Sequence, residues 1–404
     1  MRALHVVKTS EGAAWAAAQA AELVRLGVDV HVVLPAAEGK TVQAWRESGA
    51  TIHIAALDLP VRRPWLLPAV LHDARRLVSE IAPDIIHSHF VGTTVVLRLA
   101  LGRCPVPRVF QVPGPLHLEH TPYRLLDLQT AGPQDRWIGS SRCITRHYLQ
   151  SGVRHERVFL SYYGMSCSVE PAKRCHTLNR CLGIPHSALI VGNANLIYAP
   201  KWFLGQRVGL KCHEDVIDAL GLVLRQRNDV YGVLIGGVFG DGRWYEERLR
   251  KRAATVGNGR ILMPGCFSAA EVRQCWPDFD CAVHVPLSEN CGGVVEPLAA
   301  GVPTIAGRVG GLPEVVLDGV TGRTVALRDP QALASAIHDV LCNLDRYRFL
   351  AKTGQTLVRA AFDVRRTASE ILQIYRHILD SAAPRPEEFN TAVFAAKNRM
   401  LAHA

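Results

Sequence analysis

Two glutamates flank a pair of glycines near residue 290, and these residue types suit a ligand with both phosphates and hydroxyl groups. Gly292 and Gly293 lie between Glu289 and Glu296, directly after the apolar run 281–285. Glycines let the backbone approach a ligand closely, and the free N–H groups at a helix start attract an anion. The carboxylates would bind hydroxyl groups, so a nucleotide-sugar fits the segment. A glycine turn followed by a glutamate in the first turn of a helix, predicted here over residues 294–301, explains the same residues.

Basic side chains also lie earlier in the chain, just before a helical pattern that starts near residue 214. Arg207 and Lys211 lie four residues apart in this stretch, and Lys201 in the longer loop 195–209 is an alternative. Two cations near a helix start can neutralise the two phosphates of a departing nucleotide. A solvated basic loop explains the same residues without any ligand.

A histidine cluster follows the apolar run 108–112. The intervening Pro-Gly-Pro sequence cannot continue a strand, so it directs the loop outward from the strand's carboxyl end. His117 in this loop is the first candidate, with His120, Glu119 and His89 as alternatives. A single histidine is more often structural, but clustering at strand ends favours a functional role.

Strand and helix patterns alternate along the chain, in one series from about residue 2 to 139 and a second from 189 to 306. This alternation predicts an α/β protein with two doubly wound parallel sheets facing one cleft, where ligands bind at the carboxyl ends of strands. Gly12, after the first strand, would lie at such an edge, although a lone glycine there is more often only a turn. The dinucleotide fingerprint G-x-G-x-x-G is absent, which argues against a nicotinamide enzyme.

Composition limits the class of protein. The chain has 404 residues, of which 48% are hydrophobic and 20% charged, so it can bury large cores and is not disordered. No apolar stretch is long enough to span a bilayer, and the N-terminus is typical of a first strand rather than a signal peptide. Eleven scattered cysteines without a Cys-x-x-Cys pair favour reduced thiols in the cytosol.

The net charge of +10 is compatible with nucleic acid, an anionic membrane surface or a phosphorylated substrate. No basic run is interleaved with aromatic residues, so nucleic acid is the weakest of the three. Residues 61–71 place arginines beside Trp65 and several leucines. This composition suits an interfacial helix, and an ordinary helix packed on a sheet explains it equally well.

The segment 288–316 resembles the signature of glycosyltransferase family 4, which comprises retaining enzymes of the GT-B fold. It reads Ser-Glu-Asn-Cys-Gly-Gly-Val-Val-Glu-Pro-Leu-Ala-Ala-Gly and then Val-Pro-Thr-Ile-Ala-Gly-Arg-Val-Gly-Gly-Leu-Pro-Glu-Val-Val. The signature continues through Gly310, Gly311, Glu314 and Gly322. One departure concerns spacing, because the family commonly has seven residues between the glutamates and this chain has six. Counting back from Glu296 places Ser288 at the usual first position, and the first role is assigned to Glu289.

The resemblance implies roles for individual residues. Glu296 would bind the ribose, Glu289 the hydroxyls of the transferred sugar, and the amides of residues 291–293 the diphosphate. His117 would contact the donor sugar. The catalytic set implied is His117, Glu289, Lys211 and Arg207, and the donor-binding set is Gly12, Glu296, Cys291, Gly292, Gly293 and Val294.

The resemblance also implies a function. A GT-B protein of this kind would move a sugar from a nucleoside-diphosphate donor to a saccharide or polyprenyl-linked saccharide in polysaccharide biosynthesis, in the cytoplasm or peripherally at the inner face of the membrane. It would need no cofactor and no obligatory metal, and Asp280 in the sequence Asp278-Phe-Asp280 is expected to be structural. The alternatives are a nucleotide-sugar epimerase of the same fold and a non-catalytic nucleotide-sugar-binding subunit.

The expected domains follow the two strand–helix series. Residues 1–170 would form an N-terminal acceptor-binding domain, completed by a helix at about 365–380. Residues 186–364 would form the nucleotide-sugar-binding domain, and residues 381–404 a linker and tail.

Overall fold

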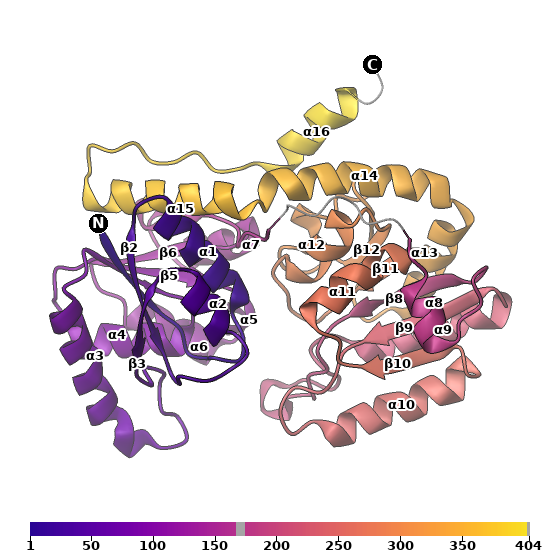
Figure 1. Ribbon diagram of the computed structural model, residues 1–404, viewed down its shortest axis with the longest axis horizontal. Helices are drawn as coiled ribbons and strands as arrows, with labels where there is room; N and C mark the ends of the chain where they lie inside the picture. The colour runs from indigo at the N-terminus through magenta and orange to yellow at the C-terminus, as the bar shows by residue number, and fades with distance from the viewer. Residues whose placement is uncertain (167–173, 402–404) are drawn as a thin grey trace. The chain divides into compact units, whose positions relative to one another are not determined.

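The computed structural model describes residues 1–166 and 174–401, so the predicted boundary at residue 170 and the last three residues of the predicted tail lie outside the described residues (Figure 1). The chain divides into two compact units. The first comprises Met1–Cys167 and Ala361–Phe389, and the second comprises Ser168–Ala360 and Asn390–Ala404. Within the predicted tail, residues Thr391–Leu401 form helix α16.

The first unit contains a seven-stranded parallel sheet in the order β3-β2-β1-β4-β5-β6-β7. Its strands are β1 (Arg2–Val6), β2 (Asp29–Leu34), β3 (Thr51–Ile54), β4 (Ile85–Ser88), β5 (Arg108–Val112), β6 (Asp135–Gly139) and β7 (Val158–Leu160). Its helices are α1 (Ala14–Arg25), α2 (Val42–Glu47), α3 (Leu67–Ile81), α4 (Val91–Leu101), α5 (Leu116–Glu119), α6 (Thr121–Gln129), α7 (Arg142–Gln150) and α15 (Val364–Leu379), with short 3-10 turns at Pro64–Leu66 and His155–Arg157.

Helices cover both faces of this sheet (Figure 1). Alternate side chains of β1 point to opposite faces, so Ala3 packs in the cluster that contains residues of α1 and α15, whereas Leu4 packs with residues of α3 and α4. Burial on both faces explains why these strands read as continuous apolar runs in the sequence.

The second unit contains a six-stranded parallel sheet in the order β10-β9-β8-β11-β12-β13. Its strands are β8 (Leu189–Ala194), β9 (Val230–Ile235), β10 (Ile261–Gly265), β11 (Cys281–His284), β12 (Thr304–Gly307) and β13 (Arg323–Val325). Its helices, besides α16, are α8 (Thr177–Leu182), α9 (His213–Gln226), α10 (Arg243–Gly257), α11 (Ala269–Cys275), α12 (Gly292–Ala299), α13 (Pro330–Cys342) and α14 (Leu344–Ala361), with 3-10 turns at Trp202–Leu204, Trp276–Asp278 and Leu312–Glu314.

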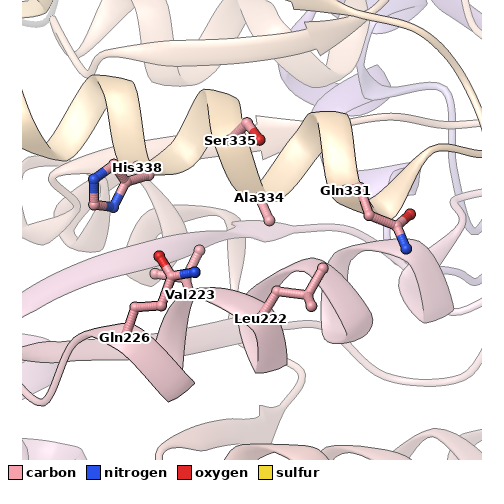
Figure 2. Close-up of a pocket in the computed structure, with 7 residues that line it drawn as sticks. All are labelled: Leu222, Val223, Gln226, Gln331, Ala334, Ser335 and His338. Atoms are coloured by element: carbon pink, nitrogen blue, oxygen red, sulfur yellow. The ribbon is translucent and has the colours of Figure 1, made fainter.

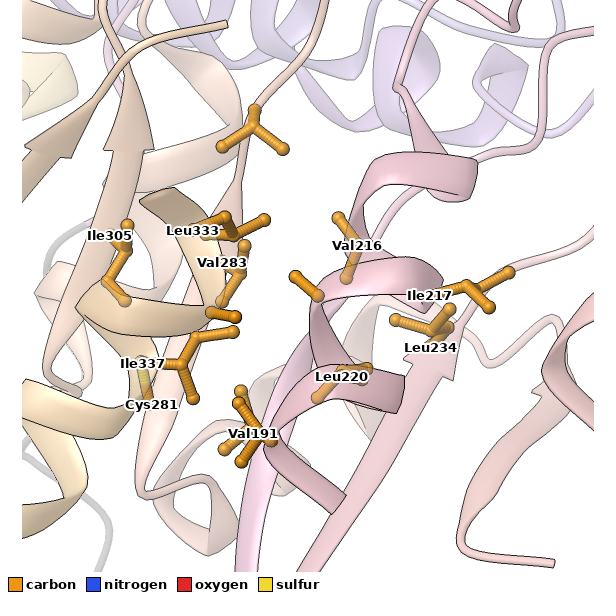
Figure 3. Packing of buried hydrophobic residues seen from close by; sticks show 14 of the residues in the cluster. Val191, Val216, Ile217, Leu220, Leu234, Cys281, Val283, Ile305, Leu333 and Ile337 are labelled. Carbon is orange, nitrogen blue, oxygen red and sulfur yellow. The ribbon is translucent and has the colours of Figure 1, made fainter. Parts of the chain in front are cut away.

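A large apolar core joins this second sheet to α9, α10 and α13. Val191 of β8 and Val283 of β11 are buried against Leu220 of α9 and Ile337 of α13, as Figure 3 shows. The residues of β11 thus have little freedom to move, which matters because this strand leads directly to the glutamate and glycine segment.

Both sheets have the strand order of a doubly wound nucleotide-binding fold, so the prediction of two Rossmann-like parallel sheets is confirmed. The direction of winding reverses between β1 and β4 in the first unit and between β8 and β11 in the second. Ligands of such sheets bind beyond the carboxyl ends of the strands at this reversal. The segments after β8 and β11 are therefore the place to look for a site in the second unit.

Candidate functional site

Glu289, in the segment after β11, contacts the side chains of Lys211 and His284. Lys211, which precedes α9, forms an ion pair with Glu289 Oε2. The same oxygen is 3.0 Å from His284 Nε2, and Oε1 accepts the backbone N–H of Asn290 at 3.0 Å. Burial alone would raise the pKa of Glu289, but Lys211 and His284 hold that pKa well below its usual range. The carboxylate is thus charged and held in place.

His284 is a site residue that the sequence analysis missed. It is the last residue of β11 and is buried, with its Nδ1 3.2 Å from the side-chain Nδ2 of Asn195. Asn195 follows the end of β8, the neighbouring strand in the sheet. The only signal in the sequence was position, because both residues stand where an adjacent parallel strand ends.

Two glycines are required by the packing around Glu289. A Cβ atom on Gly293 would lie 2.1 Å from His284 Nε2. Gly310 has a φ of +55°, and its Cβ atom would lie 1.7 Å from the carbonyl oxygen of Glu289. Real Cβ contacts are never this short, so these positions exclude any other residue. The glycines therefore allow the chain to close around the carboxylate.

Helix α12 starts at Gly292, with Cys291 at the N-cap position and no side chain capping its first N–H groups. Gly292 is exposed, whereas Cys291 and Val294 are buried, and the Val294 N–H donates to the Cys291 carbonyl oxygen at 3.3 Å. The glycine pair is therefore the part of the start of α12 that suits an anion.

Glu296 is placed differently from the expectation. Because α12 starts two residues before the predicted 294, Glu296 lies in the second turn of the helix rather than the first. Its side chain is exposed and accepts a hydrogen bond from Trp276 Nε1 at 3.3 Å. The helix dipole therefore does not explain this glutamate. Trp276 is its hydrogen-bond partner in the structure, and its role at the ribose stays a prediction.

The two predicted cations behave differently. Lys211 contacts Glu289, whereas Arg207 is exposed and pairs with no carboxylate in the part of the chain that the structure describes. Lys201 is also exposed. The structure thus brings Lys211 to the glutamate site and leaves the roles of Arg207 and Lys201 as predictions.

Gly12 lies in the segment between β1 and α1 of the first unit. Its carbonyl oxygen accepts a hydrogen bond from the Thr41 hydroxyl at 3.1 Å. The nearest atom to a Cβ placed on Gly12 would be Thr9 Cγ2 at 3.9 Å, which is ordinary van der Waals contact. The fold of this unit therefore does not require glycine here, so its role at a diphosphate stays a prediction.

His117 belongs to a buried polar network. Its Nε2 is 3.1 Å from the Tyr148 hydroxyl and 3.3 Å from Asp127 Oδ2. Asp127 also accepts from Arg98 at 2.7 Å. Burial alone would raise the pKa of Asp127, but Arg98 and the hydrogen bond from His117 lower it below its usual range. His117 thus has a structural task beside its predicted catalytic one.

The alternatives to His117 occupy contrasting positions. Glu119 ends α5 and is exposed, and His120 is the N-cap residue of α6 and is partly exposed. His89 follows β4 and is fully buried. Full burial separates His89 from any substrate.

His89 forms a cluster with His5 and His87, and one ring nitrogen of each lies within 4.8 Å of the others. Burial lowers the pKa of His5 to about 3 and those of the other two well below 6.5, so all three imidazoles are neutral, as metal ligands must be. The Tyr375 and Tyr163 hydroxyls already contact these rings. Among the described residues no carboxylate hydrogen-bonds to the cluster, so a divalent ion would bury its charge uncompensated. We therefore assign the cluster to the core.

Asp278 and Asp280 serve the second unit's own structure. Asp278 accepts backbone N–H groups of Cys175, His176 and Leu178 at 2.8–3.1 Å, at the start of α8. Asp280 pairs with Arg174 at 2.8 Å. These contacts explain both carboxylates without a metal ion.

A cavity of about 320 Å³ lies between α9 and α13 (Figure 2). It is lined by Leu222, Val223, Gln226, Gln331, Ala334, Ser335 and His338. None of these residues was predicted to bind the donor.

No helix of the described residues is long and apolar enough to cross a membrane. In the predicted interfacial segment, Trp65 is 71% exposed and Val61 77% exposed. Both residues precede α3, in which Leu77 and Ile81 are buried. The segment 61–66 therefore presents apolar side chains to solvent, while the end of α3 packs in the core.

Two family models match the chain. Residues 12–164 match the model of the glycosyl transferase 4-like domain, and residues 202–343 match that of glycosyl transferases group 1. Together these ranges span most of the chain and correspond to the two units.

Curated relatives and solved structures agree with these models. The chain is 32% identical over 187 residues to a D-inositol 3-phosphate glycosyltransferase of Frankia alni, and 29% identical over 282 residues to one of Streptomyces scabiei. These matches cover 45% and 63% of this chain and 46% and 59% of the relatives, so the chain aligns with about half the length of each.

Among solved structures, the chain superposes on Anabaena HepE in complex with UDP and glucose with a TM-score of 0.76 and 20% identity, covering 93% of this chain and 99% of HepE. This similarity shows a shared fold. By its two matched domains the chain thus belongs to glycosyltransferase family 4, and it has the GT-B fold.

Proposed function

We propose that this chain is a retaining glycosyltransferase that takes a nucleoside-diphosphate sugar as donor. Lys211 would neutralise the departing diphosphate, Glu289 would bind hydroxyls of the transferred sugar, and Glu296 would bind the ribose. The acceptor would attack the face from which the diphosphate departs, and a phosphate oxygen would take its proton. No carboxylate nucleophile is needed in this scheme.

One observation carries the proposal. Lys211, Glu289 and His284 meet beside the uncapped start of α12, at the point where the sheet reverses its winding. This arrangement combines a cation and the amides of the glycine pair for phosphate with a charged carboxylate for hydroxyl groups. A nucleotide-sugar needs both kinds of group.

The acceptor is proposed in two forms. The basic net charge and the exposed apolar side chains of segment 61–66 favour a saccharide carried on a polyprenyl lipid in polysaccharide assembly. The curated relatives are named D-inositol 3-phosphate glycosyltransferases, so a phosphorylated cyclitol is the second acceptor to examine.

The proposed chemistry requires no metal ion. Lys211 supplies a positive charge for the diphosphate, and Asp278 and Asp280 are occupied by protein groups. We therefore expect donor binding and transfer to persist in EDTA.

The first experiment is a thermal-shift screen with UDP, GDP and ADP and their common sugar conjugates, in EDTA. A ligand at a hundred times its Kd stabilises the folded protein by about 2.7 kcal/mol, which gives a clear rise in Tm. We expect one base to stand out. No response to any nucleotide would contradict the proposal.

Transfer is then followed by NMR with the selected donor and the two acceptor classes. We expect the anomeric configuration of the donor to be kept in the product. An inverted product would exclude the retaining mechanism, and conversion of the donor without an acceptor would favour a nucleotide-sugar epimerase.

A further inference from the structure

Two side chains compete for one oxygen of Glu289. Lys211 and His284 both contact Oε2, while Oε1 faces the backbone N–H of Asn290. In the proposed function Lys211 is also the cation that binds the donor diphosphate. A single ammonium group cannot keep its full contact with the carboxylate while it turns to two phosphates, so Glu289 needs another partner once the donor is bound.

The hydrogen-bond pattern defines the protonation of His284. A carboxylate only accepts hydrogen bonds, so the proton must be on His284 Nε2, 3.0 Å from Glu289. Nδ1 then carries the lone pair and accepts from the amide group of Asn195 at 3.2 Å. Burial keeps the imidazole neutral by lowering its pKa. Asn195, His284 and Glu289 thus form a chain of hydrogen bonds with one direction.

His284 and Lys211 differ in freedom of movement. The His284 side chain is 3% exposed, belongs to β11 and packs against Gly293, where even a Cβ atom would clash with the ring. The Lys211 side chain is 16% exposed and ends a flexible four-carbon stem. A bound diphosphate can therefore move the ammonium group, but it cannot move the imidazole.

We propose that His284 is a positioning residue that keeps Glu289 aimed at the donor sugar when Lys211 moves from Glu289 to the diphosphate. This inference rests on the proposed function. Asn195 completes the device, since its amide group selects the tautomer that donates to the carboxylate. The two partners of Glu289 thus have separate tasks: Lys211 binds the phosphates, and His284 orients Glu289 toward the sugar.

The proposal predicts different effects on nucleotide and on nucleotide-sugar. A variant that lacks the His284 imidazole keeps Lys211, so it still binds a nucleoside diphosphate without a sugar. Its Glu289 is no longer oriented, so the affinity that the sugar adds to the nucleotide and the rate of sugar transfer both decrease. A general structural defect would weaken the two ligands together.

The test compares two variants of His284. His284→Leu removes the N–H group that donates the hydrogen bond to Glu289, whereas His284→Gln keeps an amide nitrogen that can take the place of Nε2. Calorimetric titrations use UDP, GDP and ADP and UDP-glucose, GDP-mannose and ADP-glucose, and turnover is measured with the donor that binds. For His284→Leu we expect kcat to fall about 10- to 100-fold, the equivalent of one charge-assisted hydrogen bond, and nucleoside diphosphate affinity to stay within about twofold. His284→Gln should restore most of kcat.

His213→Leu is the matched control. His213 is a buried imidazole at the start of α9. Among the described residues it forms no hydrogen bond or ion pair with Glu289, and its Nδ1 has no hydrogen-bond partner there. We expect its replacement to leave the preference for nucleotide-sugar over nucleotide unchanged. Equal losses in His213→Leu and His284→Leu, or no rescue by His284→Gln, would overturn the positioning role.

A second measurement needs no ligand. In ¹⁵N-histidine NMR spectra, signals absent from His284→Gln identify His284 in the wild-type protein. We expect a protonated Nε2 and an unprotonated Nδ1. The opposite tautomer would refute the inference, whereas failure of the wild type to bind any nucleotide would refute the proposed function and leave the tautomer result standing on its own.

Discussion

At the scale of single residues, the site in the second unit depends on a balance of charge around Glu289. Lys211 supplies the only full positive charge that contacts this carboxylate among the described residues, and the His284 imidazole is neutral because burial lowers its pKa. Lys211 therefore has two tasks, to stabilise Glu289 in the free protein and to stabilise the leaving diphosphate during transfer.

We predict that Lys211→Met lowers kcat by about 100- to 1,000-fold, the cost of removing one preorganised charge from a developing anion. Steady-state kinetics with the donor selected by thermal shift measure this effect. Lys201→Met is the control, because Lys201 is exposed and lies in the neighbouring loop. A larger loss in Lys201→Met than in Lys211→Met would transfer the role to Lys201.

His117 presents a different balance between structure and catalysis. Its Nε2 lies close to Asp127 and Tyr148, so replacing it leaves a buried carboxylate with one partner fewer. We predict that His117→Leu lowers the free energy of unfolding by about 1–3 kcal/mol, measured by urea denaturation. Unchanged stability together with lost turnover would show that the residue acts on substrate alone.

At the scale of elements, the segment that leads into α3 has exposed apolar side chains that the fold does not explain. Trp65, Val61 and Leu66 are exposed there beside Arg62 and Arg63, whereas Leu77 and Ile81 of α3 itself are buried. Aromatic and apolar side chains next to arginines suit the interface of an anionic bilayer. The exposed segment and the packed helix after it can therefore account for both interpretations that the sequence left open for residues 61–71.

We predict that Trp65→Ser reduces the fraction of protein that sediments with phosphatidylglycerol vesicles at low salt, with no change for neutral phosphatidylcholine vesicles. Leu99→Ser is the control, since Leu99 is an exposed apolar residue on α4. Equal binding of wild type and Trp65→Ser to anionic vesicles would exclude a membrane contact by segment 61–66.

At the scale of the whole molecule, several buried neutral histidines link folding to pH. Burial lowers the pKa of His5 to about 3 and that of His213 to about 4, and it also lowers those of His87 and His89. In the unfolded chain the same groups take up protons below about pH 6.5. Between these values the unfolded state binds more protons, so this contribution to stability is complete above pH 6.5 and is lost as the pH falls.

We predict that the free energy of unfolding decreases between pH 6.5 and pH 4.5, by up to about 1.4 kcal/mol per pH unit for each such histidine. Urea denaturation across this range measures the slope, and His5→Phe should make it shallower. A stability that rises as the pH falls would contradict the neutral state of the buried imidazoles.

Most strands could be predicted from the sequence because each is a short apolar run buried on both faces. The strands β7 and β13 were not predicted, since each has only three residues and ends its sheet. Such short edge strands form because they hydrogen-bond to the backbone of a neighbouring strand, and a local sequence pattern does not indicate that pairing. The start of α12 was placed two residues late because glycines are poor indicators of a helix.

The sequence by itself determined the two doubly wound sheets, the glutamate and glycine segment and the glycosyltransferase family, because these depend on local periodicity and on a contiguous motif. Only the tertiary structure decided the partners. It joined Lys211 and His284 to Glu289, left Arg207 in solvent and tied His117 to Asp127. The physical reason is that charge pairs and buried hydrogen bonds form between residues far apart in the chain, at strand ends that only the folded sheet brings together.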